Sequence, residues 1–213
     1  PKQTLDLVAR DVEEVISLCA HHISVYCLTW EVGTAFWGKR ARGTLIPVVE
    51  DLEREMFEMV IDQLAEAGYH QYEVSNFAQP AMNCRHNEAY WDCRAWEAFG
   101  PGAARFDGRN RTTNLRSVSV WIKKLLNHQS VTGDVDTMTA EGAARERLVL
   151  GLRRRCGVDR PAFFQASGFE VDDLAQQPIQ EWVAAGFAED DGRRVRLTRS
   201  GMLLSDSLWS AVL

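Results

Sequence analysis

The feature that most constrains the fold is an alternation of helical and strand patterns over the first third of the sequence. Residues 4–20 and 48–67 carry apolar side chains at helical spacing, and residues 22–30 and 69–78 show the shorter period of strands. The order helix–strand–helix–strand predicts parallel strands joined by right-handed crossovers, and therefore an α/β fold. Two strands are too few for a complete barrel or a doubly wound sheet, so we expect earlier strands to be missing.

The connections in this region carry polar residues that allow two interpretations. Residues 31–47 contain three glycines and a proline, which predicts a loop, and the basic run at 39–42 is interpreted as solvated. A contact between that run and an acidic ligand group is the alternative. Glu73, Ser75 and Asn76 lie near the end of the second strand, where parallel sheets bind ligands. Alternatively, these three side chains satisfy the backbone of the next loop.

From about residue 117 the pattern becomes mostly helical. Ser117 and Thr139 are the expected N-caps of two helices, because hydroxyl side chains precede apolar residues at helical spacing. Asp107-Gly108 and Asp191-Gly192 are typical hairpin turns. Further expected elements are helices over residues 160–167, 171–185 and 199–213, and a hairpin over residues 187–198.

Helices followed by a hairpin resemble a winged-helix module, so nucleic-acid binding has to be weighed. Residues 117–213 hold 12 Lys and Arg against 13 Asp and Glu, whereas a phosphate-binding surface needs clustered positive charge. We therefore expect no nucleic-acid partner, and we favour a helical lid or a partner-binding domain. The expected domains are residues 1–116 and residues 117–213.

Composition excludes several other classes of protein. Hydrophobic residues make up 46% of the sequence and the net charge is −6, so the chain can form a sizeable core. The five cysteines are widely spaced and form no C-x-x-C pair, which argues against zinc-ribbon and thioredoxin-type sites. No apolar run is long enough to span a membrane and no signal peptide opens the chain, so we expect a cytoplasmic location.

The six residues His86-Asn87-Glu88-Ala89-Tyr90-Trp91 combine residue types that ordinary core or surface patterning does not require. If the segment is helical, His86 and Tyr90 share one face, and Asn87 and Trp91 share another. One interpretation is a ligand site. The alternative is the polar start of a helix whose aromatic rings close the mouth of a barrel.

Several motifs follow one another in a specific order. They are HISVYCLTWEVGT at 22–34, GY at 68–69 with YEVSNFA at 72–78, HNEAYW at 86–91, GPGA at 100–103, LGLR at 150–153 with GV at 157–158, and LT at 197–198 with GMLL at 201–204. This ordered set resembles the oxygen-independent coproporphyrinogen III oxidase-like radical-SAM family over essentially the whole chain. The pattern H-N-x-x-Y-W matches the signature of the family's haem-chaperone branch.

The resemblance implies the second half of a partial (β/α)6 barrel, followed by a mostly helical, winged-helix-like C-terminal domain over its mouth. In the full-length family the barrel holds a [4Fe–4S] cluster and S-adenosylmethionine. The family's C-x-x-x-C-x-x-C cluster motif does not occur in this sequence, so we do not expect this chain alone to hold the cluster or to cleave the cofactor. We expect either a fragment of a longer protein or a form that has lost the radical half.

The resemblance also implies a haem site at the H-N-x-x-Y-W motif. His86 is the candidate axial ligand of the iron, because imidazole is a common haem ligand. Tyr90 and Trp91 would supply flat apolar surface, and Asn87 would supply a hydrogen bond. The alternative for His86 is a structural histidine whose hydrogen bonds are satisfied within the protein.

Thr29 and the backbone around Ala104 stand where family members contact the adenosyl cofactor, so weak contacts of that kind are expected there. The preferred function is haem binding and transfer by a chaperone. The alternatives are oxidative decarboxylation of coproporphyrinogen III and a non-catalytic binding module, which is what the chain alone would be. The expected partners are haem or a porphyrin, a haem-accepting protein, and further copies of the chain through self-association.

Overall fold

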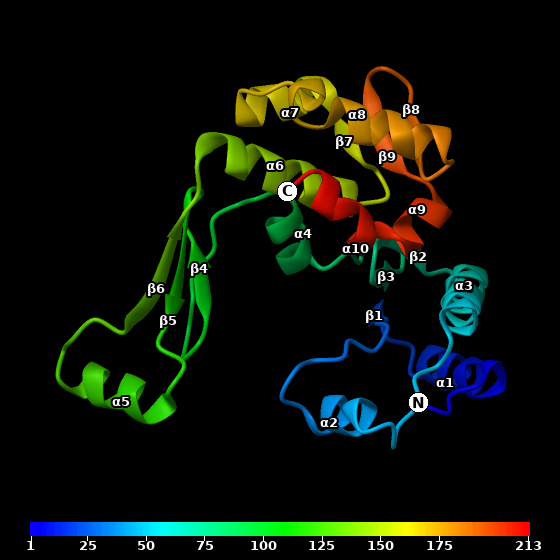
Figure 1. Ribbon diagram of the computed structural model, residues 1–213, viewed down its shortest axis with the longest axis horizontal. Helices are drawn as coiled ribbons and strands as arrows, with labels where there is room; N and C mark the ends of the chain where they lie inside the picture. Colours follow the sequence, from blue (N-terminus) through cyan, green and yellow to red (C-terminus); the bar gives the residue numbers. More distant parts are fainter. The chain divides into compact units, whose positions relative to one another are not determined.

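The computed structural model describes all 213 residues, and Figure 1 shows its helices and strands. The chain divides into two compact units, Pro1–Cys84 and Arg85–Leu213. The boundary expected after residue 116 lies inside the second unit, and the division into domains 1–116 and 117–213 stays a prediction. The combination of helices and short strands in both units confirms a mixed α/β composition.

The first unit is built from two long helices and a small sheet. Thr4 caps the first helix as expected, because the backbone N–H of Leu7 donates to Thr4 Oγ1 at 3.3 Å. Gly68 follows the second long helix with φ +85°, a left-handed conformation that glycine adopts without steric cost. The elements are α1 (Leu5–Ser17), β1 (His22–Ser24), α2 (Ala35–Ala41), α3 (Glu50–Glu66), β2 (His70–Glu73) and β3 (Asn76–Ala78).

A hydrophobic core fixes the position of α1 and α3 in the first unit. The two helices lie side by side in Figure 1, and their apolar faces are buried together. Phe77, in the middle strand of the sheet, is completely buried and anchors this core. The other buried members are Val8, Val12, Ile23, Met56, Val60, Leu64 and Tyr69.

The predicted parallel pairing is wrong. The sheet has the order β1-β3-β2, and β3 is antiparallel to both neighbours. The single strand expected over residues 69–78 turns back after Glu73, whose carboxylate accepts the backbone N–H of Ser75 at 2.9 Å. This reversal makes a hairpin and places β3 between the two strands that were expected to pair. The expected strand at 22–30 is also shorter, because β1 ends at Ser24.

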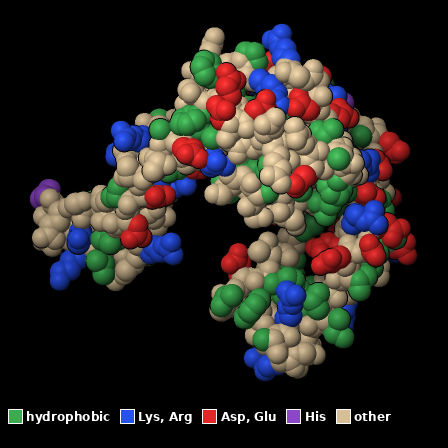
Figure 2. Space-filling view, turned by 45° about the horizontal axis from the view of Figure 1, so that its top comes forward, with side chains coloured by type: hydrophobic (Ala, Val, Ile, Leu, Met, Phe, Trp, Pro, Cys, Tyr) green, Lys and Arg blue, Asp and Glu red, His purple; other side chains and the backbone are tan.

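The expected loop at 31–47 contains the short helix α2, which the glycine-rich pattern concealed. Thr34 is its N-cap, and its side chain accepts the backbone N–H of Trp37 at 3.2 Å. The basic run falls in the last turns of this helix, where the guanidinium of Arg40 lies 4.9 Å from the ring of Trp30. Figure 2 shows hydrophobic side chains exposed beside basic ones on the surface of this part of the first unit.

The second unit contains two antiparallel sheets and most of the helices. Its sheets have the orders β4-β5-β6 and β7-β9-β8. The elements are α4 (Arg85–Trp91), β4 (Ala104–Phe106), β5 (Asn110–Asn114), α5 (Val118–Leu126), β6 (Thr132–Thr137), α6 (Ala140–Leu152), β7 (Val158–Asp159), α7 (Arg160–Ser167), α8 (Val171–Ala184), β8 (Ala188–Asp190), β9 (Arg194–Leu197), α9 (Arg199–Leu203), α10 (Ser205–Leu208) and the 3-10 helix η1 (Trp209–Ala211).

Both hairpin predictions in the second unit are confirmed. The turn at 107–108 joins β4 to β5, and the turn at 191–192 joins β8 to β9. Strand β6 was missed, because every one of its residues is exposed and its composition of Thr, Gly, Asp and Val lacks an apolar alternation. The expected closing helix over 199–213 is three short helical pieces. The core gathers around α6, with Leu148, Leu152, Val171 and Val195 completely buried.

Candidate functional site

The motif at residues 86–91 forms the short helix α4. The rings of His86 and Tyr90 lie on one face, with their centroids 4.8 Å apart and their planes at 88°. His86 is exposed, and neither nitrogen of its imidazole has a hydrogen-bond partner in the protein. The two rings therefore meet edge to face, and no protein group engages the nitrogens of His86.

Trp91 lies on the other face of α4, against a cation. The guanidinium carbon of Arg153 lies 5.1 Å from the centre of the Trp91 ring, within the range of a cation–π contact. The indole N–H of Trp91 is buried without a hydrogen-bond acceptor in the protein. Asn87 is half-buried and already engaged in an interaction. The orphaned indole donor is a feature that a bound ligand would satisfy.

An aromatic run continues from α4 to β4. The Tyr90 and Trp96 rings are 4.2 Å apart, and the Trp96 and Phe106 rings are 4.9 Å apart. The indole N–H of Trp96 donates to the backbone carbonyl of Ala104 at 2.8 Å, which fixes the ring against the hairpin. Trp96 and Phe106 were not predicted as site residues, since neither falls in a contiguous motif with Tyr90.

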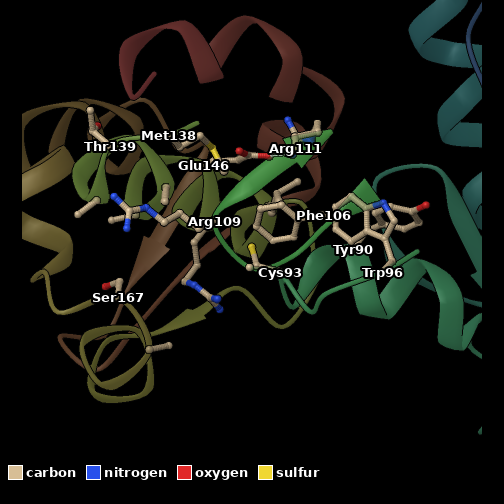
Figure 3. Close-up of a pocket in the computed structure, with 17 residues that line it drawn as sticks. Tyr90, Cys93, Trp96, Phe106, Arg109, Arg111, Met138, Thr139, Glu146 and Ser167 are labelled. Atoms are coloured by element: carbon tan, nitrogen blue, oxygen red, sulfur yellow. Dashed lines mark hydrogen bonds and ion pairs between the residues drawn. The ribbon is translucent and has the colours of Figure 1, made fainter. Parts of the chain in front are cut away.

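Beside this aromatic run the second unit has a cavity of about 380 Å³. In Figure 3, Tyr90, Trp96 and Phe106 lie on one side of it, and Arg109, Thr139 and Ser167 on the other. The charged residues in its lining are Arg109, Arg111, Glu146 and Arg147. The cavity therefore combines flat apolar surface with a concentration of positive charge.

One ion pair joins β5 to α6 in the cavity wall, and a second lies just beyond the ends of α4 and α6. Arg111 Nη2 lies 2.5 Å from Glu146 Oε1, and Arg154 Nη1 lies 2.5 Å from Asp92 Oδ1. Arg147 donates to the backbone carbonyl of Asp92 at 3.2 Å. Burial raises the pKa of the neighbouring Cys93 thiol, and the charge of Arg147 only partly opposes that effect. At neutral pH this thiol is therefore a neutral part of the lining.

The six site residues predicted from sequence fall in both units. His86, Asn87, Tyr90, Trp91 and Ala104 lie in the second unit, and Trp96 connects the last of these to the α4 motif. The backbone carbonyl of Ala104 is already an acceptor for that tryptophan. Thr29 lies in the first unit, where its side chain is exposed.

The polar residues at the end of β2 form an internal network. Glu73 is completely buried, and its carboxylate accepts from the Asn76 side chain and from the backbone N–H of Ser75. Ser24 Oγ donates to Asn76 Oδ1 at 2.5 Å. These contacts favour the interpretation that the residues stabilise the turn between β2 and β3, although Glu73 Oε2 is buried without a partner.

Two further structural observations bear on function. No group of three or more His, Cys, Asp or Glu side chains is placed to hold a metal ion. The helices of this chain do not include one that combines the length and apolar character needed to cross a bilayer.

Comparison with known proteins identifies relatives over the whole chain. A family model described as the HemN C-terminal domain matches residues 138–204. Heme chaperone HemW of Bacillus subtilis (strain 168) is 32% identical over 213 residues, which are 100% of this chain and 56% of that protein. Heme chaperone HemW of Lactococcus lactis subsp. lactis (strain IL1403) is 30% identical, with the same coverage.

Two other similarities extend this result. The mitochondrial radical S-adenosyl methionine domain-containing protein 1 of Danio rerio is 31% identical over 224 residues, covering 100% of this chain and 50% of that protein. The solved structure of coproporphyrinogen III oxidase (HemN) from Escherichia coli, a radical SAM enzyme, superposes with a TM-score of 0.79 at 15% identity. The superposition covers 100% of this chain and 52% of the oxidase chain, and it shows that the two share a fold. The chain thus spans about half the length of the relatives it matches.

Proposed function

We propose a role in haem binding and transfer, on the premise that this chain corresponds to the C-terminal portion of the haem-chaperone branch of the oxygen-independent coproporphyrinogen III oxidase-like radical-SAM family. Two of the relatives that match the chain from end to end at about 30% identity are named as haem chaperones. Their names support haem as the ligand of the whole protein. Within this chain, the α4 motif is the place where we expect the contact.

The observation that carries this proposal is the free imidazole of His86. It is exposed, its ring meets that of Tyr90 edge to face, and its nitrogens make no hydrogen bond within the protein. One histidine is a sufficient protein ligand for haem iron, because the porphyrin itself supplies four nitrogen ligands. The buried indole N–H of Trp91 adds an unsatisfied donor beside the same helix. The residues present therefore fit a haem contact.

The cluster and S-adenosylmethionine of the full-length family fit this chain less well. The cluster would supply the electron that a radical SAM reaction requires, and it needs three cysteine thiolates close together. Here the five cysteines form no such group. The backbone carbonyl of Ala104, which could contact S-adenosylmethionine, already accepts a hydrogen bond from Trp96. We therefore assign Thr29 and Ala104 no more than weak contacts with S-adenosylmethionine.

A second candidate function is oxidative decarboxylation of coproporphyrinogen III by the full-length protein. The fold shared with the oxidase of Escherichia coli favours it. The H-N-x-x-Y-W motif argues for the chaperone branch instead. Turnover of coproporphyrinogen III by the full-length protein would make oxidative decarboxylation the preferred function instead of haem transfer. A haem-accepting protein and self-association stay predictions.

The test is a titration of haemin into the chain, followed by the position and intensity of the Soret band. We expect saturable binding, and we expect the His86→Ala variant to shift the band and to bind at least about tenfold more weakly, since an axial bond is lost. A matched control is His128→Asn, which removes another exposed histidine of the second unit at a left-handed position that asparagine tolerates. Identical spectra and affinities for wild type and His86→Ala would remove His86 from the site.

A further inference from the structure

The cavity of the second unit begins where the α4 motif ends. The ring of Tyr90 contacts His86, and Tyr90 is also part of the cavity lining. From Tyr90 the aromatic surface continues through Trp96 to Phe106, with ring centroids 4.2 Å and 4.9 Å apart. A flat conjugated ligand prefers such a surface, because offset or tilted ring contacts add to the burial of apolar area. Shape and polarity therefore favour a planar ring on this wall.

The second feature of the cavity is positive charge that has no carboxylate partner within the protein. Glu146 is paired with Arg111, while Arg147 makes a single hydrogen bond to a backbone carbonyl. Arg109 is exposed and has no ion pair or hydrogen bond through its side chain. The chain as a whole carries a net charge of −6, so two guanidinium groups without a carboxylate partner in one cavity are not a consequence of composition.

Guanidinium groups select the chemistry of the ligand. Arginine pairs with carboxylates in a planar, two-pronged geometry, and such charge-assisted hydrogen bonds are stronger than neutral ones. Two arginines without a carboxylate partner, beside an aromatic wall, match a planar ring that carries two carboxylates on one edge. At about 380 Å³ the cavity is at the small end of ligand sites, so it suits one edge of a large macrocycle rather than the whole of it.

We propose that this cavity holds the carboxylate-bearing edge of a porphyrin, with Arg109 and Arg147 as the carboxylate partners and Tyr90, Trp96 and Phe106 as the ring surface. The proposal rests on the proposed haem function and adds a second, iron-independent part to the same site. His86 would recognise the metal, and the arginines would recognise the acid groups. Neither part requires the other for its own chemistry.

The probe that separates the two parts is metal-free protoporphyrin IX, compared with its dimethyl ester. The free acid should bind the wild-type chain, with quenching of tryptophan fluorescence as the readout. The Arg109→Gln/Arg147→Gln variant should bind it at least about tenfold more weakly, because two charge-assisted contacts are lost. The ester should bind wild type as weakly as the acid binds the variant. His128→Asn, the control histidine variant, should leave binding of the metal-free acid unchanged.

The matched control is Arg116→Gln/Arg155→Gln, which makes the same change in charge at two exposed arginines outside the cavity. It should retain wild-type affinity. Arg109→Gln alone is the second test, since that exposed side chain has no structural partner whose loss could unfold the protein. Equal affinity for acid and ester, or an equal loss in the control pair, overturns the proposal. Loss of the His86-dependent Soret shift with the arginine effect intact would instead contradict the haem function alone.

Discussion

The imidazole of His22 shows how burial sets a protonation preference at a single residue. It is half-buried at the start of β1, with Nε2 3.0 Å from the phenolic oxygen of Tyr72. Burial lowers the pKa of His22 from its ordinary value of 6.5, and the negative charge of Glu73 only partly opposes this. The folded chain therefore prefers the neutral ring, whereas the unfolded chain takes up a proton more readily. Stability from this residue is present above pH 6.5 and is lost as pH falls through the folded-state pKa.

The lowered pKa of His22 gives a prediction for unfolding by denaturant between about pH 7.5 and about pH 5. The wild-type chain should lose more unfolding free energy on acidification than a His22→Gln variant, because glutamine can hydrogen-bond but does not titrate in this range. His21→Gln is the control, since His21 is the exposed neighbour, and it should follow wild type. Parallel pH profiles for wild type and His22→Gln would show that the buried imidazole does not control the acid sensitivity.

At the scale of elements, local patterns predicted the long helices, the caps of α1 and α6 and the tight turns, and failed where a side-chain hydrogen bond reverses the chain inside a strand-like pattern. Helical spacing located α1, α3 and α6, since each buries one apolar stripe. The hairpin between β2 and β3 depends on the Glu73 carboxylate accepting the Ser75 N–H, and strand periodicity alone does not register such a reversal.

One part of the candidate site was predicted from the sequence, and another part was not. The α4 motif is contiguous and was found from its residue types, together with the pairing of His86 and Tyr90 on one face. The cavity was not found, because its lining comes from separate segments. Phe106 comes from β4 and Arg147 from α6. No spacing rule connects residues that far apart in the sequence, so only the tertiary structure brings their charges and rings together.

Two N-caps of the second unit allow a matched test of capping. Thr139 accepts the backbone N–H of Gly142 at 3.0 Å at the start of α6, whereas Ser117 at the start of α5 makes no such bond. Thr139→Ala should lower the free energy of unfolding by about 1 kcal/mol, because one helix donor loses its partner. Ser117→Ala should change it by less than about 0.5 kcal/mol. Equal effects in chemical denaturation would contradict the assignment of these caps.

For the molecule as a whole, each unit has a hydrophobic core of its own. The cluster around Phe77 consists entirely of residues of the first unit. Leu148, equally inaccessible to solvent, belongs to α6 in the second unit. The α4 motif and the cavity both lie in the second unit, so their geometry depends first on the packing around α6. Stability of the first unit should matter less to the proposed porphyrin contacts.

Hydrogen exchange in truncation variants of the two cores tests this dependence. Phe77→Ala should cost about 3–5 kcal/mol and Leu148→Ala about 2–5 kcal/mol, because each leaves a cavity at a fully buried position. The first should raise amide exchange mainly in α1 and α3, and the second mainly in α6 and the sheet of β7, β8 and β9. Protoporphyrin binding should weaken with Leu148→Ala and persist with Phe77→Ala at temperatures where both variants remain folded. Equal deprotection of both units by either substitution would mean that one cooperative core supports the site, since independent packing predicts a local response.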